Sequence, residues 1–271
     1  MHLRGTYRPG WSGKIGRGSR MMDNAKTYLN TLFFLFSLLP AAYSQPADTT
    51  VEAKIWEGIG GKQNWQDVRY FMFSCLERAG DTSQGVREYL WDKQTGDCRF
   101  EEVSKDGDTV ITLFNLKTEK GAAFINSEKQ GDSLKSAKLI QEALSTFRKD
   151  ASLLFLPTTM EGRNAIHAVE KEKLIGSRRF TVIKLANEKT SFDASVNGQL
   201  YIDARNGRIQ HWQPNRADQR DTAYYTVSEF KDVGGGLVLP THFTASDSSS
   251  TVSYPLAAAL IHIESHKLNK P

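Results

Sequence analysis

Apolar and polar residues alternate along five short segments in the first half of the chain. Within each segment most apolar residues recur at every second position, as in a strand with one face buried and the other in water. Turn-forming residues separate the segments, and this close spacing is typical of an antiparallel meander. The five predicted strands are residues 68–77, 86–92, 98–103, 108–115 and 121–126.

A second series of strands follows in the other half of the chain. Two helices are predicted as well, because apolar residues recur every three or four positions in residues 47–61 and again in residues 132–150. The order of elements is therefore helix, meander, helix, meander. The second series of predicted strands is 164–174, 179–186, 198–204, 208–213, 222–231, 237–245 and 258–267.

This order predicts a mainly β protein of the α+β class. About 10 to 12 strands would form a single curved antiparallel sheet, an unclosed β-barrel whose inner face needs a cover. The N-terminal helix and the mid-chain helix are expected to cap the opening. No linker rich in Pro, Gly or Ser divides residues 45–271, so we expect one half-barrel domain there.

The segment from Thr31 to Gln45 is apolar and too short to span a bilayer, and it resembles the core of a secretory signal peptide. We expect cleavage between Ser44 and Gln45, which makes residues 1–44 a leader. Residues 1–20 lack any hydrophobic period and precede Met21 and Met22, so translation is expected to start at one of these methionines. The signal peptide would then be residues 21–44.

Removing the leader changes the charge of the protein. The full sequence has a formal net charge of +4, but residues 45–271 have 29 basic and 30 acidic residues, a net charge of −1. Nucleic acid is therefore not an expected partner. No cysteine that could carry a lipid follows the apolar run, so we expect a protein that is exported to the periplasm and does not insert stably into a membrane. We also expect a monomer.

Only two cysteines are present, Cys75 and Cys98. Export makes a disulfide chemically possible. They lie on the first and third predicted strands, about two strand spacings apart, which exceeds the Cα separation of a disulfide. Two reduced, packed thiols are favoured over a bridge.

Two acidic turns share one pattern. In "WDKQTGD", Asp92 precedes Gly96 by four positions, and in "DARNG" Asp203 precedes Gly207 by four. Such an Asp can accept hydrogen bonds from backbone amides ahead of it, while the Gly takes the left-handed conformation of a hairpin turn. Neither stretch supplies the alternating oxygen ligands of a calcium loop. Both are predicted to be structural turns.

Enzymatic motifs are lacking: the sequence has no nucleophile elbow, phosphate loop, paired CxxC or zincin motif. On the predicted last strand, His262, Glu264 and His266 would share one face, which is plausible geometry for part of a metal site. A strand whose polar face meets water explains the same three residues. We expect no enzyme and no cofactor, and a metal-dependent hydrolase built on these residues remains an alternative.

Several stretches, taken in order, resemble the bacterial periplasmic lipoprotein-carrier superfamily of the LolA/LolB type. They include "YLWDKQTGDCRFE", "KLIGSRRFTVIKL" and "LYIDARNGRIQHW". The resemblance implies an unclosed barrel with a cavity for acyl chains and no chemistry. The expected partner is a hydrophobic small molecule, a lipid or a lipoprotein, together with an envelope protein.

Strand aromatics usually fill a core, but in a wide open barrel they can line a cavity for an apolar ligand. A third alternative is therefore an envelope interaction module whose barrel is filled by its own side chains. The candidate cavity residues are Phe73, Tyr89, Trp91, Phe100, Leu154, Phe155, Phe180, Ile202 and Trp212.

Overall fold

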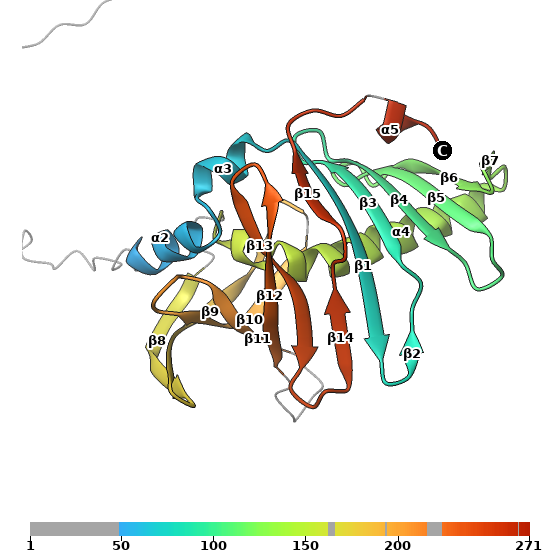
Figure 1. The fold of residues 1–271 in the computed structure, drawn as a ribbon. Coiled ribbons are helices and arrows are strands. Elements are labelled where there is room, and N and C mark those ends of the chain that lie inside the picture. The colour runs from blue at the N-terminus through green and yellow to red at the C-terminus, as the bar shows by residue number, and fades with distance from the viewer. Residues whose placement is uncertain (1–48, 162–165, 193, 216–223, 265) are drawn as a thin grey trace, which may run out of the picture. The chain divides into compact units, whose positions relative to one another are not determined.

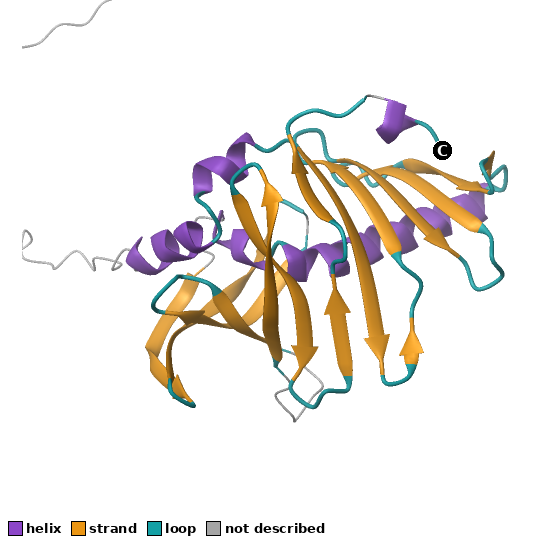
Figure 2. Ribbon diagram, in the orientation of Figure 1, coloured by secondary structure: helices purple, strands orange, loops and turns teal. Residues whose placement is uncertain are grey.

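Fifteen antiparallel strands form one sheet in the computed structural model of the protein, which describes residues 49–161, 166–192, 194–215, 224–264 and 266–271 (Figure 1). The sheet curves, and the longest of the described helices lies along one side of it (Figure 2). The strands are β1 (Tyr70–Ala79), β2 (Thr82–Ser83), β3 (Arg87–Asp92), β4 (Asp97–Val103), β5 (Thr109–Asn115), β6 (Gly121–Ile125), β7 (Glu128–Lys129), β8 (Ile166–Ile175), β9 (Arg178–Lys189), β10 (Ser195–Asp203), β11 (Ile209–Pro214), β12 (Tyr225–Gly234), β13 (Leu237–Ala245), β14 (Ser250–Ser253) and β15 (Ala257–Leu260).

The two meanders join at β1. On one side β1 pairs with β3, and from there the sheet continues through β4, β5 and β6 to β7. On its other side β1 pairs with β14 and β15, and the sheet continues through β13, β12, β11, β10 and β9 to β8. Within the described residues β7 and β8 each pair with one strand only, so the sheet is open at both edges.

The register of the strands separates an apolar inner face from a more polar outer face. Phe71, Trp91, Cys98 and Phe114 lie in one row across β1, β3, β4 and β5. All four belong to the main hydrophobic core. Because successive residues of a strand point to opposite faces, the alternation in the sequence selects which side of each strand is buried.

The helix α4 (Ser133–Leu154) crosses the inner face (Figures 1 and 2). The Asp132 carboxylate caps its first turn by accepting hydrogen bonds from the Leu134 and Lys135 amides at 2.9 and 3.1 Å. The 3₁₀ turn η1 (Leu156–Glu161) follows, with Pro157 near its start. The residues that α4 buries against the sheet are Ile140, Ala143, Leu144, Phe147, Asp150, Ala151 and Leu154.

Two short helices precede the sheet, α2 (Thr49–Gly58) and α3 (Lys62–Asp67). The helix α2 packs against the turn after β10, and Gly207 makes this approach possible. A Cβ atom at Gly207 would lie 1.8 Å from the Lys54 carbonyl oxygen, and the residue also has a φ of +70°. Only glycine meets both requirements.

The predicted fold class is confirmed: the protein is mainly β, with one curved, open antiparallel sheet and few helices. The structure adds the short strands β2, β7 and β14 and the helix α3 to the predicted elements. The predicted strand 258–267 is wrong after Leu260, because the chain leaves the sheet there and the short helix α5 (His266–Asn269) follows. Leu268 instead packs with Tyr70 and Leu90 in a small separate cluster.

Residues 1–48, which contain the predicted leader, lie outside the described residues. The cleavage site, the start of translation and the extent of the domain stay predictions. None of the helices in the described part of the chain has the length and hydropathy that crossing a membrane requires.

Candidate functional site

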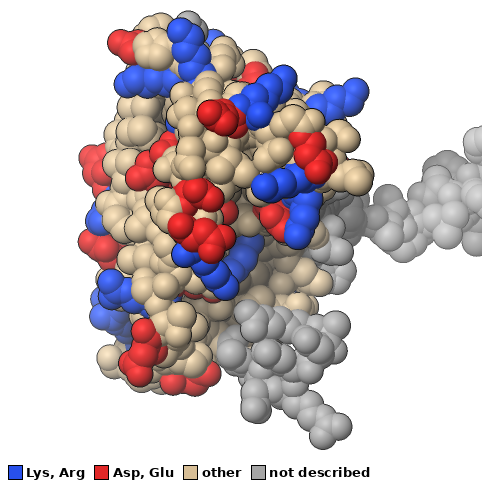
Figure 3. Space-filling model, turned by 90° about the vertical axis from the view of Figure 1, so that its right-hand side faces the viewer, with Lys and Arg blue, Asp and Glu red and all other residues tan. Residues whose placement is uncertain are grey.

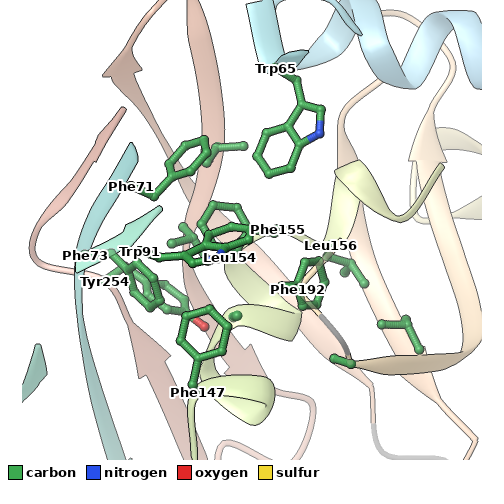
Figure 4. Close-up of a cluster of buried hydrophobic side chains, with 14 of the residues drawn as sticks. Trp65, Phe71, Phe73, Trp91, Phe147, Leu154, Phe155, Leu156, Phe192 and Tyr254 are labelled. Atoms are coloured by element: carbon green, nitrogen blue, oxygen red, sulfur yellow. The ribbon is translucent and has the colours of Figure 1, made fainter. Parts of the chain in front are cut away.

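Aromatic side chains fill the space between the inner face and the end of α4 (Figure 4). Phe155, the residue after α4, has its ring centroid 4.9 Å from that of Phe71 and 5.5 Å from that of Trp91. The rings of Phe73 and Trp65 are each 5.6 Å from it. All five side chains are at most 2% exposed. The interior is therefore tightly packed at this point.

Eight of the nine predicted cavity residues belong to this main core, and Phe180 does not. Phe180 forms a separate cluster with Val182 and Tyr201. On β9, Ile183 and Leu185 belong to the main core and therefore point to the inner face. Phe180 and Val182 have the opposite parity along the strand, so they point to the outer face. Contact with a ligand stays a prediction for all of them. The eight are Phe73, Tyr89, Trp91, Phe100, Leu154, Phe155, Ile202 and Trp212.

A buried ionic cluster joins α4 to the sheet. The Asp150 carboxylate accepts hydrogen bonds from Arg87 Nε at 2.7 Å and Arg87 Nη2 at 3.0 Å. It also accepts one from the Tyr89 hydroxyl at 2.7 Å, and the Tyr254 hydroxyl donates to the Asp150 carbonyl oxygen at 2.5 Å. None of the four residues is more than 5% exposed. Arg87, Tyr89, Asp150 and Tyr254 are called the Asp150 cluster below.

The environment fixes the protonation states of this cluster. Burial lowers the pKa of Arg87, but the hydrogen bonds and the charge of Asp150 raise it by more, so the guanidinium stays charged. Burial raises the pKa of Tyr89, and the nearby Asp150 carboxylate raises it further. The same two causes raise the pKa of the Cys75 thiol. A buried thiol with a raised pKa is a poor nucleophile.

The Asp150 cluster was not predicted from the sequence, although the position of each of its charged residues is informative. Arg87 shares a strand face with Tyr89 and Trp91, and Asp150 lies three positions after Phe147 and four before Leu154 on the apolar side of α4. A single charge on an otherwise apolar face requires a partner. Two such charges of opposite sign could have been paired with each other.

Glu102 lies beside Arg87 on β4 and is half-buried. Burial raises the pKa of Glu102 above its ordinary value of 4.5, and the charges of Glu142 and Asp150 raise it further, while Arg87 opposes the shift. Because the folded protein binds this proton more tightly than the unfolded chain, the ionised carboxylate favours unfolding. This unfavourable contribution to stability is fully present at pH values above the pKa of Glu102 in the folded protein. It disappears at pH values below 4.5, the ordinary pKa of a glutamate.

We expect Glu102→Gln to raise the free energy of unfolding at about pH 7, with a gain that shrinks towards about pH 4 as wild-type Glu102 takes up its proton. Urea unfolding at both pH values measures this difference. Glu88→Gln is the control, since Glu88 is exposed on the same strand pair and its replacement should change stability little. A loss of stability for Glu102→Gln at pH 7 would contradict the expectation.

A pocket of about 400 Å³ opens beside the Asp150 cluster, between α4 and the second half of the sheet. The apolar part of its wall includes Leu153, Val196, Trp212 and Val252. Polar side chains also line it: Glu77, Lys149, Ser152, Ser195, Asn197 and Asn215. Lys149 Nζ lies 2.6 Å from Glu77 Oε2 in an ion pair. Asp150 and Tyr254 form part of the lining, so the pocket reaches the cluster that holds α4.

The alternative metal site is not assembled. His262 and Glu264 lie in the irregular segment after β15, and His266 begins α5, so the three residues do not share a strand face. His266 Nε2 lies 3.3 Å from Glu264 Oε2, and both side chains are more than half exposed. Across the described residues, no group of three or more His, Cys, Asp or Glu side chains is placed to hold a metal ion.

Both acidic turns have the predicted geometry. The Asp92 carboxylate accepts hydrogen bonds from the Gln94 and Thr95 amides, and Gly96 has a φ of +86°. Asp203 accepts one from the Arg205 amide at 3.0 Å. The Asp92 carboxylate also pairs with Arg69, and the pKa of Asp92 is lowered because this pairing and the amide hydrogen bonds outweigh burial. These carboxylates are structural.

Cys75 and Cys98 are free and buried. They lie on β1 and β4 with β3 between them, which is the separation that the predicted strand order gave.

Neither a scan against protein-family models nor a search of curated proteins finds a match to this chain. Solved structures with a similar fold include a DUF1329 family protein from Desulfovibrio piger, at 8% identity and a TM-score of 0.45, covering 83% of this chain and 98% of that one. A LolA superfamily protein from Nitrosomonas europaea has 11% identity and a TM-score of 0.44, with the same coverage.

A third similar structure is described as an outer membrane lipoprotein-sorting protein domain from Vibrio parahaemolyticus. It has 8% identity and a TM-score of 0.41, covering 77% of this chain and 94% of that one. The function proposed below rests on the residues of this chain alone.

Proposed function

We propose that this protein binds and carries an apolar ligand, such as the acyl chain of a lipid or lipoprotein, without catalysing a reaction. The ligand would occupy the pocket beside the Asp150 cluster and extend under α4 once that helix shifts. One observation carries the proposal: a helix lies across the aromatic inner face, held by a buried ionic cluster, directly beside a preformed pocket. The exported, periplasmic location and the monomeric state expected from the sequence belong to the same proposal.

The Asp150 cluster supports a movable α4. A buried ion pair gains little net stability over well-packed apolar side chains, because both charges lose their hydration. What such a pair does provide is a defined position, since its hydrogen bonds form only when the two groups are correctly oriented. Arg87 and Asp150 therefore define the position of α4 on the sheet. They bind the helix less strongly than two further buried apolar side chains would.

Burial energy can drive the exchange of α4 for a ligand. Each methylene group that leaves water contributes about 0.8 kcal/mol, so an acyl chain with ten buried methylenes would contribute roughly 8 kcal/mol. Part of that energy offsets the contacts that α4 gives up. The pocket volume of about 400 Å³ lies within the usual range for small-molecule sites. Its lining combines apolar residues with a larger set of polar ones, which suits an amphiphile whose headgroup stays near water.

The test is a titration with a fluorescent fatty acid. We expect saturable binding to the wild-type protein and about a tenfold or greater loss of affinity in Leu153→Glu, because a carboxylate in the apolar wall opposes an acyl chain. Leu134→Glu is the matched control, being the same change on the same helix at a side chain that is 81% exposed. Circular dichroism establishes that both variants fold.

Two results would contradict the carrier. One is a wild-type protein that does not bind the fatty acid, and the other is equal binding by the Leu153→Glu and Leu134→Glu variants.

An interaction module with a filled barrel is the second candidate, because aromatic side chains occupy the interior around Phe155. That candidate predicts no saturable binding of fatty acid by any variant.

A further inference from the structure

The turn between β8 and β9 exposes large apolar side chains. Leu174 is 68% exposed and Ile175 is 41% exposed. Leu174 pairs with Arg179 and Ile175 pairs with Arg178 across the hairpin, and Gly176 makes the turn with a φ of +60°. Residues 173–179 are called the β8–β9 tip below. The Leu174 and Ile175 side chains therefore keep exposed apolar surface that a partner can contact.

The hairpin that carries the tip is basic. Residues 170–184 contain five basic and two acidic residues, whereas residues 45–271 together have a net charge of −1. The side chains of Lys173, Arg178 and Arg179 are exposed. Glu172 is 3.6 Å from Arg179 in a pair whose side chains are both more than half exposed, so water screens it strongly.

Another face of the molecule mixes its charges. The face over β4 to β7 and the first part of α4 has Lys and Arg interspersed with Asp and Glu (Figure 3). The β8–β9 tip is different because two adjacent exposed apolar residues lie between basic residues on both arms of one turn. That combination matches a surface with an apolar layer beneath a negatively charged one.

A bilayer that contains anionic lipids has these two layers. Leucine and isoleucine side chains enter the boundary of the acyl chains, while arginine and lysine meet the phosphate groups above it. A protein strand adding to the edge of β8 is disfavoured, since that edge carries alternating Glu and Lys residues and two irregularities of register. We propose that the β8–β9 tip docks this protein reversibly on an anionic lipid surface.

The experiment is co-sedimentation of the processed protein, its N-terminus identified by mass spectrometry, with lipid vesicles. We expect binding to vesicles that contain phosphatidylglycerol, weaker binding in high salt, and little binding to pure phosphatidylcholine. Leu174→Ser/Ile175→Ser should weaken binding to the anionic vesicles about tenfold or more, since two apolar contacts are lost. Arg178→Gln/Arg179→Gln should weaken it by a similar factor.

The matched control is Ile261→Ser, which removes an apolar side chain that is 77% exposed outside the tip. Its vesicle binding should equal that of the wild-type protein. The proposal is overturned if the wild-type protein does not co-sediment with anionic vesicles at low salt, or if it binds phosphatidylcholine vesicles equally well. It is also overturned if both tip variants bind anionic vesicles as strongly as the wild-type protein. Fatty-acid binding by the tip variants is expected to be unchanged, so this proposal and the carrier can fail separately.

Discussion

Replacing Asp150 by alanine is expected to lower the free energy of unfolding by about 3–5 kcal/mol, because the change leaves the Arg87 guanidinium charged in the core without its hydrogen-bonded carboxylate. The other carboxylate near it, that of Glu77, is 3.7 Å away and also pairs with Lys149. Arg87 is 5% exposed and donates two hydrogen bonds to Asp150, so water cannot replace the lost carboxylate without opening the structure. The Tyr89 hydroxyl loses its acceptor as well. Denaturation in urea, followed by circular dichroism, measures the loss.

The double variant Arg87→Met/Asp150→Leu separates the cost of an unpaired charge from the value of the pair. With both charges replaced by apolar side chains, the cost of the unpaired charge should disappear. The buried Tyr89 hydroxyl still lacks its acceptor, so a deficit of about 1–3 kcal/mol relative to the wild type should remain. Tyr254→Phe, which removes one hydrogen bond to the Asp150 carbonyl, should cost only about 1 kcal/mol. An Asp150→Ala variant as stable as the wild type would show that the cluster does not hold α4.

Replacing Phe155 by alanine is expected to lower the free energy of unfolding by about 3–5 kcal/mol, because a fully buried ring is removed from the centre of the aromatic interior. Four neighbouring ring centroids lie within 5.6 Å of it, those of Phe71, Phe73, Trp91 and Trp65. Packed rings of this size cannot collapse fully into the space. The result should be an apolar cavity, which urea unfolding detects as lost stability.

An apolar cavity of this kind takes up small apolar molecules. Benzene at a concentration one hundred times its dissociation constant would restore about 2.7 kcal/mol of the lost stability by mass action. Leu134→Ala is the control, since Leu134 is 81% exposed and its loss should change stability by less than about 0.5 kcal/mol, with no response to benzene. Rescue that also occurs in the control would mean that benzene acts elsewhere.

Together the two variants test different parts of one arrangement. Asp150 positions α4 over the inner face, and Phe155 fills the space where α4 ends. A carrier needs both: a position that the helix returns to, and an interior whose apolar surface a ligand can take over. An interaction module needs only the filled interior, so the fatty-acid titration decides between the two functions.

The sequence determined the elements that depend on local pattern. Apolar alternation located most of the strands, and the three-to-four spacing from Leu134 to Phe147 located α4, since a strand or helix must bury one face. The two Asp-to-Gly turns followed from hydrogen bonds between residues at most three positions apart and from left-handed glycines.

The tertiary structure decided what depends on distant partners. Arg87 and Asp150 are 63 positions apart, and no periodicity says that their strand and helix meet. Phe180 is as apolar as Phe73, yet the register of β9 turns it to the outer face. The chain after Leu260 continues an alternating pattern but leaves the sheet, and Leu268 packs against Tyr70 and Leu90. Pattern fixes which face of an element is apolar, while pairing across the sheet and the fit of side-chain volumes fix what that face contacts.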